Sequence, residues 1–186
     1  MLLAPLYVDG APSHVLAFLE QAETVCREKK LSFPFYAISN NGFVEGRQNE
    51  PHLRIYENWC RCSGVIWGGG LGIGGGVMLH CLCLLLPIFA LLHTVQAVMM
   101  AKSGTLTVLS ALHCYAGTLM DLFFCAGLFW GLGLMGRRVR KGICGKNRYT
   151  RVLVPSFLFL PCADVFMLLS ALFHGTLPHR LFKKEP

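Results

Sequence analysis

Three long runs that carry almost no charge constrain this chain more than any other feature of its sequence. Residues 62–101 contain no charged side chain, residues 103–136 contain only Asp121, and residues 152–176 contain only Asp164. A membrane-spanning helix needs about 20 consecutive apolar residues, so each run is long enough to cross a bilayer. The sequence therefore predicts an all-α integral membrane protein with three transmembrane helices.

We place the transmembrane anchor at residues 62–176, with spans near 63–86, 104–136 and 152–175, and a short tail at 177–186. The first run is too long for one simple helix, because its 40 residues at about 1.5 Å each would extend roughly 60 Å. Pro87 is the natural break in this run. A short second helix after Pro87 would give four spans instead of three.

The net charge of +7 is concentrated beside the predicted spans and does not indicate nucleic-acid binding. Segment 137–151 holds seven Lys and Arg residues and no acid. The positive-inside rule places such a loop on the cytoplasmic or matrix side of the membrane. With three spans, the N-terminal segment lies on the same side and the tail lies on the opposite side.

Residues 1–61 form a small polar segment that we expect to lie outside the bilayer. Ser13 can cap an amphipathic helix from His14 to about Lys30. One amphipathic helix in a segment this short cannot close a hydrophobic core. We therefore expect the segment to dock on a partner protein.

The first predicted span contains seven glycines within residues 68–76. In a membrane helix, such glycines remove side-chain bulk and favour tight packing of a second helix. A flat cofactor could approach the backbone in the same way. The run alone leaves both interpretations open.

The second apolar run carries the pattern His113-x-x-x-Gly117-x-x-x-Asp121. At about 100° per residue, these three residues share one helix face. A histidine with a glycine one turn further on suits a haem site, because the imidazole can ligate iron and the missing side chain leaves room for the porphyrin. The same histidine could instead be a hydrogen-bonded packing residue.

Two other arrangements of intramembrane groups are open. His80 and His93 have a spacing that is typical of two-haem cytochromes b, although the second run offers only His113 as a partner. Asp121 and Asp164 could form paired acids in a small transporter or channel, because ionisable groups inside a membrane usually serve a function.

Residues 47–65 contain the string Arg47-x-x-x-Pro51-His52-Leu53-x-Ile55-Tyr56, followed by Arg61-Cys62-Ser63-Gly64-Val65. This string resembles the segment that leads into the first membrane helix of the cytochrome b membrane anchor of succinate dehydrogenase, respiratory complex II. The small size, the segment order and the three predicted spans agree with that family. The interval between Tyr56 and Arg61 is shorter than in the family.

The resemblance implies a membrane-anchor subunit of succinate:ubiquinone oxidoreductase in the mitochondrial inner membrane, with its N-terminus on the matrix side. Such a subunit is not catalytic by itself. It docks the iron–sulfur and flavoprotein subunits, here through residues 1–61, with docking contacts from Arg47, Pro51, His52 and Tyr56. Arg61 and Ser63 would help to bind the substrate ubiquinone.

The same resemblance implies a haem b that is shared with a second membrane-anchor subunit. His113 would supply one axial ligand to the haem iron, Gly117 would pack against the porphyrin, and Asp121 would give polar support. The alternative is a cofactor-free structural accessory subunit of another mitochondrial inner-membrane respiratory complex.

Overall fold

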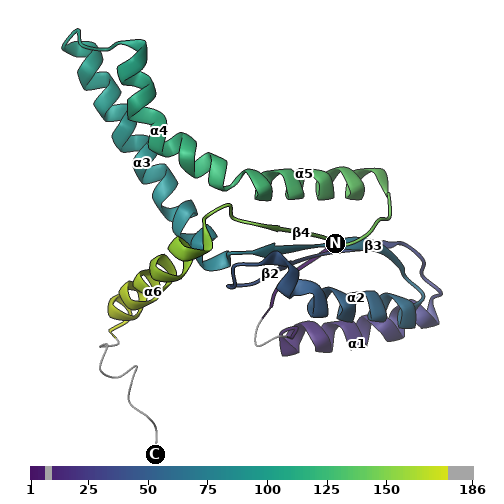
Figure 1. Cartoon of the computed structure of the whole chain (residues 1–186). Coiled ribbons are helices and arrows are strands. Elements are labelled where there is room, and N and C mark those ends of the chain that lie inside the picture. Colours follow the sequence, from purple (N-terminus) through teal and green to yellow (C-terminus); the bar gives the residue numbers. More distant parts are fainter. Residues whose placement is uncertain (7–9, 176–186) are drawn as a thin grey trace, which may run out of the picture.

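The computed structural model describes residues 1–6 and 10–175, so the predicted tail at 177–186 lies outside the described residues. A parallel sheet forms the centre of the fold (Figure 1). Its four strands lie in the order of the chain: β1 (Leu2–Pro5), β2 (Pro34–Asn40), β3 (Ile66–Gly74) and β4 (Arg148–Arg151). The fold is therefore mixed, and the prediction of a purely all-α protein is wrong.

The helices fall into two groups, those that cover the sheet and those that extend away from it. In chain order they are α1 (Ser13–Glu28), the 3-10 helix η1 (Gly46–Asn49), α2 (Glu50–Ser63), α3 (Gly76–Lys102), α4 (Val108–Phe124), α5 (Ala126–Lys141) and α6 (Ser156–Phe173). The sheet is covered on both faces, by α1 and α2 on one side and by α5 on the other (Figure 1).

The two faces of β2 supply the two halves of the core. Phe35 and Ala37 face α1 and α2, where Leu53 and Trp59 are buried against them. Tyr36 and Ile38 face the opposite way, toward α5. Because the strands lie in chain order and α5 is on the other face, the β3–β4 connection has the opposite hand to the two before it.

The predicted N-terminal segment contains more structure than one amphipathic helix. The helix expected from His14 is confirmed as α1, which buries Val15, Leu19 and Cys26. Ser13 is its first residue and does not cap it, because Pro12 takes the cap position. A second amphipathic helix, α2, follows within the motif that resembles succinate dehydrogenase. It ends at Gly64, whose φ of 78° is a left-handed conformation that glycine adopts readily.

The glycine run is a strand of the sheet and not part of a membrane helix. A side chain at Gly70 would lie 2.7 Å from Leu53 Cδ2, and one at Gly72 would lie 2.7 Å from the Gly46 carbonyl oxygen. A side chain at Gly74 would overlap the Gly46 backbone nitrogen. The glycines therefore let α2 and η1 approach the sheet closely. This is close packing within an α/β layer and not packing of a second membrane helix.

The membrane segments differ from the predicted spans in their boundaries. The helix after β3 runs unbroken from Gly76 to Lys102 with Pro87 inside it, so Pro87 is not the break that we expected. Residues predicted as the second span form α4 and α5, with a bend of 50° between them. Since α5 buries Leu128 and Met135 against the sheet, this part of the apolar run covers the core.

Within the described residues 1–6 and 10–175, the two helices α3 and α6 are long and apolar enough to cross a membrane, and the bent pair α4–α5 would be a third if it counts as one span. Only 6% of an apolar 18-residue stretch of each of these two helices is buried, so their apolar surfaces need a lipid-like surrounding. In Figure 1, α3 and α6 both leave the sheet on the side of the carboxyl ends of its strands. These features indicate association with a membrane.

A methyl group at Gly74 tests the close contact between β3 and η1. We expect Gly74→Ala to lower the free energy of unfolding by about 1–3 kcal/mol, because the added atom must displace the backbone of η1. Gly133→Ala is the matched control on α5, where no atom beyond the backbone of the helix itself lies within 4 Å of the added carbon. Chemical denaturation of both variants in the same detergent measures the difference, and equal stabilities would contradict the packing described.

Candidate functional site

A chain of buried polar side chains joins η1 and α2 to the sheet. Tyr56 donates its hydroxyl proton to His52 Nε2, and His52 Nδ1 lies 2.7 Å from Ser39 Oγ. Ser39 in turn donates to Asn49 Oδ1 at 2.7 Å. Asn49 Nδ2 donates to the carbonyl oxygens of Gly46 and Ile73, each at 3.0 Å.

These hydrogen bonds specify one protonation state of His52. Ser39 uses its only proton on Asn49, so His52 Nδ1 carries a proton and donates it to Ser39 Oγ. His52 Nε2 then accepts from Tyr56, and the imidazole is neutral. Burial lowers the pKa of His52 to about 4 and raises the pKa of Tyr56 to about 12. Both side chains are fully buried, which indicates a structural role.

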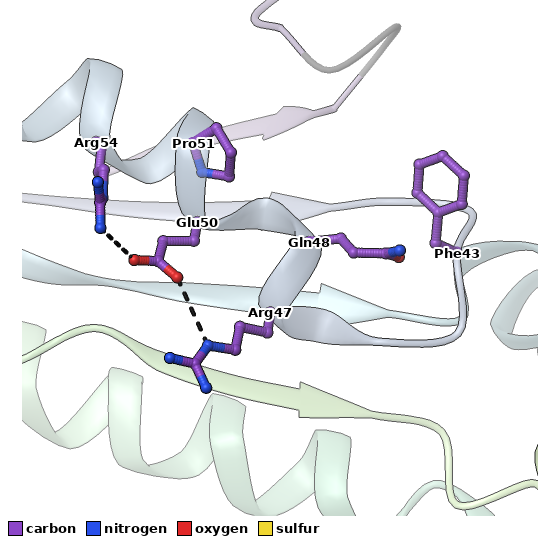
Figure 2. Close-up of a pocket in the computed structure, with 6 residues that line it drawn as sticks. All are labelled: Phe43, Arg47, Gln48, Glu50, Pro51 and Arg54. Carbon is purple, nitrogen blue, oxygen red and sulfur yellow. Dashed lines mark hydrogen bonds and ion pairs between the residues drawn. The ribbon is translucent and has the colours of Figure 1, made fainter.

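An open hollow of about 650 Å³ lies where η1 meets α2 (Figure 2). Its lining comes from the loop after β2, from η1 and from the first turns of α2: Phe43, Arg47, Gln48, Glu50, Pro51 and Arg54. We call it the Arg47 hollow. Asn49 and His52 join η1 and α2 to the sheet by hydrogen bonds, so the backbone of the hollow is held in place before any ligand binds.

The charges in the Arg47 hollow are unequal. Glu50 Oε1 lies 2.6 Å from Arg54 Nη2, and Glu50 Oε2 lies 3.6 Å from Arg47 Nε. The hydrogen bond and the positive charge of Arg54, with a smaller effect of Arg47, lower the pKa of Glu50. One carboxylate thus faces two guanidinium groups, and the Arg47 side chain remains 81% exposed.

The structure separates the residues that the resemblance implies for docking and for the quinone site. Arg47 and Pro51 line the Arg47 hollow, whereas His52 and Tyr56 are buried beneath it. Arg61 is exposed in the last turn of α2, on the sheet domain. Ser63 is buried and donates to the Cys60 carbonyl oxygen at 3.3 Å, so Arg61 and Ser63 do not line a common pocket.

The residues implied for haem binding all lie on α4. His113 lines a second hollow, between α3 and α4. Gly117 faces His93 of α3, whose Cε1 would lie 3.4 Å from a side-chain carbon at this position. Asp121 is one turn further along α4, and Arg61 is on a different part of the molecule. Within residues 1–6 and 10–175, no group of three His, Cys, Asp or Glu side chains is placed to hold a metal ion.

Comparison with known proteins adds no family to this description. Neither the family models, nor the curated proteins, nor the solved structures include one that matches this chain. The site must therefore be interpreted from its own geometry.

Sequence reasoning missed several residues of the site. Phe43, Glu50 and Arg54 were not singled out, although the turn signal Asn40-Asn41-Gly42 marks the loop that carries Phe43. The i, i+4 spacing of Glu50 and Arg54 is also a visible signal of an ion pair on a helix. No local pattern identifies Ser39 as a partner of His52, because the two residues meet only in the folded chain.

Acid should weaken the domain through His52. The folded state holds the pKa of His52 near 4, below its ordinary value of 6.5, so the unfolded chain binds a proton more readily between these pH values. We expect the free energy of unfolding to fall as the pH is lowered from about 6.5 to about 4, and this part of the decline to be absent in His52→Gln. His14→Gln, which changes an exposed histidine on α1, is the control and should keep the decline.

Denaturation at several pH values measures these slopes. His52→Gln should also be less stable at pH 7 by about 1–3 kcal/mol, because it leaves buried partners unsatisfied. A decline in His52→Gln as steep as in the unmodified chain would contradict a neutral, buried His52.

Proposed function

We propose that this chain is a membrane-anchored α/β domain that binds a phosphate-bearing ligand in the Arg47 hollow. The position of the hollow carries the proposal. Open parallel sheets bind ligands outside the carboxyl ends of their strands, where neighbouring connections run to opposite faces of the sheet. Here β2 leads to α2 on one face of the sheet, whereas β3 leads by way of α3 and α4 to α5 on the other face (Figure 1). The hollow lies just after the carboxyl end of β2.

The chemistry of Arg47 supports a phosphate. In Figure 2 its Nε faces Glu50, and its two terminal nitrogens point away from that carboxylate. A guanidinium group presents a planar fork of donors that matches the oxygens of a phosphate. Glu50 balances only one of the two arginines, so the hollow keeps an excess positive charge.

The location relative to the membrane helices leaves two sources for the phosphate. Phe43 is 53% exposed on the loop after β2, at the carboxyl side from which α3 and α6 leave the sheet. A lipid headgroup at the membrane surface could reach this side, with its glycerol and first methylenes against the Phe43 ring. A soluble mononucleotide could place its base on the same ring.

Binding to the full chain in nanodiscs tests the proposal. The probes are adenosine monophosphate and inorganic phosphate, added to nanodiscs of zwitterionic lipid, and phosphatidylglycerol in the bilayer itself. We expect Arg47→Gln to weaken binding of the preferred probe about tenfold or more, which corresponds to about 1.4 kcal/mol. Calorimetry reports the soluble probes, and crosslinking of a photoactivatable phosphatidylglycerol to the chain reports the lipid.

Arg27→Gln is the matched control, because Arg27 also forms an exposed i, i+4 ion pair, with Glu23 on α1. It should bind each probe as the unmodified chain does. Equal effects of the two substitutions, or no binding of any of the three probes, would contradict a phosphate site at Arg47.

The anchor subunit of succinate dehydrogenase stays a prediction from the resemblance alone. It is tested by succinate-driven reduction of ubiquinone in the material that co-purifies with the chain in mild detergent. Malonate-sensitive activity would support it. An intact complex with another enzyme, and no dependence on Arg61 or His113, would favour the accessory-subunit alternative.

A further inference from the structure

The helix α5 has two faces with different surroundings. One face packs on the sheet, where Leu128, Gly131 and Met135 are buried. The opposite face is exposed along the whole helix, and no other element drawn as a ribbon in Figure 1 covers it. We call it the outer face of α5, and its exposed residues are Phe129, Trp130, Gly133, Arg137, Arg140 and Lys141.

The half of the outer face that follows α4 is apolar and aromatic. The side chain of Trp130 is 64% exposed, and Phe129 beside it is also exposed. The guanidinium group of Arg148 on β4 lies over the Trp130 ring, 5.8 Å from its centroid. Exposed aromatic side chains of this size are costly in water, and tryptophan is enriched where lipid meets water. This half of the face therefore suits the headgroup region of a bilayer.

The other half of the outer face is basic. Arg137, Arg140 and Lys141 lie exposed in the last turns of α5. The chain has no Asp or Glu between Asp121 and Asp164, and among the side chains of residues 1–6 and 10–175 none forms an ion pair with these three. Their positive charge is therefore uncompensated, and it complements an anionic lipid surface.

The position of α5 in the chain brings its outer face to the membrane. The helix α4 packs along the apolar helix α3, and α5 follows α4 after a single residue, Cys125. The bend of 50° turns α5 away from the axis of α4. Because membrane helices tilt by ~20° on average, α5 can lie near the membrane surface where α4 leaves the bilayer. In Figure 1, α3 and α4 rise from the side of the sheet that α5 covers.

We propose that the outer face of α5 lies on the membrane surface and binds acidic lipids. Phe129 and Trp130 enter the headgroup region, and Arg137, Arg140 and Lys141 bind the phosphates of acidic lipids. A helix that is apolar on part of its exposed face and basic on the rest is typical of helices that lie in this interface. The sheet would then be held with α5 toward the bilayer and with α1 and α2 away from it. This inference does not rest on the Arg47 hollow.

NMR signals of the tryptophan indole groups test this inference with the full chain in nanodiscs that contain phosphatidylglycerol. The chain has three tryptophans, and the Trp130 signal is assigned by its loss in Trp130→Phe. A small fraction of the lipid is phosphatidylglycerol or phosphatidylcholine that carries a spin label near the top of one acyl chain. We expect both to broaden the Trp130 signal, and labelled phosphatidylglycerol to broaden it more. Neither should broaden the signal of Trp59, which donates to the Leu19 carbonyl oxygen on the other face of the sheet.

The double variant Arg137→Gln with Arg140→Gln tests the charges, and it should lose the excess broadening by labelled phosphatidylglycerol. Lys29→Gln with Lys30→Gln is the matched control, because it removes two exposed charges just after α1, and it should keep the excess. Unchanged signals of Trp59 and Trp67 show that each variant is folded. A Trp130 signal that neither lipid broadens would overturn the membrane contact. Equal broadening by both lipids in the unmodified chain would overturn the binding of acidic lipids.

Discussion

The backbone of η1 rests on the carboxyl half of β3, and this contact determines where α2 begins and where the Arg47 hollow forms. Gly72 and Gly74 have no side chains, so the backbone of η1 rests directly on β3. This closeness lets Asn49 donate to the Ile73 carbonyl oxygen, which joins η1 to β3. The first turns of α2 follow at once, so η1 positions Arg47, and α2 positions Glu50 and Arg54. Larger side chains at Gly72 and Gly74 would push η1 away from β3.

The interior and the surface of this region have opposite electrostatic characters. Beneath α2, the hydrogen bonds from Tyr56 to Asn49 satisfy neutral groups, and burial keeps His52 uncharged. On the outer side, two arginines share one carboxylate in contact with solvent. Exposed ion pairs contribute little to stability, so the arginines are free to exchange Glu50 for a ligand at small cost. The neutral interior provides the rigidity that the charged surface lacks.

An ion pair links the loop at the Arg47 hollow to the strand that leads into the apolar helix α6. Arg151 at the end of β4 forms an ion pair with Glu45, in the loop that carries Phe43. The residues that follow Arg151 pack with α3 and α6, since Val152, Val154 and Phe159 share a cluster with Met78 and Leu82. Arg151, Val152 and Val154 thus connect the sheet and the Arg47 hollow to the first turns of α3 and α6.

Much of the membrane character could be predicted from the sequence, and the sheet could not. The uncharged runs contain α3 and α6, because a helix that faces lipid needs apolar side chains all round. The glycines of β3 belong to the same uncharged run as α3, and nothing local distinguishes them from a flexible membrane helix. In the folded chain, Leu53, Tyr36 and η1 pack into the space that the absent side chains leave, and this packing favours the strand. That is a tertiary cause, which composition does not reveal.

The candidate site could be predicted only in part. Arg47 and Pro51 belong to a visible motif, and both line the hollow. Arg61 is expected at the mouth of a membrane span, but the helix that carries it ends at Gly64 and leads into a strand. The apolar run at residues 126–136 has the composition of a span, whereas α5 uses Leu128 and Met135 to cover the sheet. Burial in a protein core and burial in lipid require the same side chains, so hydropathy alone cannot separate them.

Backbone chemical shifts of Leu71 and Ile73, measured by solid-state NMR on the full chain in lipid bilayers, address the position of β3 in the sheet. We predict the values of an extended strand at both residues, together with magnetisation transfer between Leu71 and Ile38 of β2, its partner in the sheet. Helical shifts at Leu71 and Ile73, continuous with those of Met78 and Leu82, would contradict the α/β fold and would restore a single membrane helix across residues 63–86.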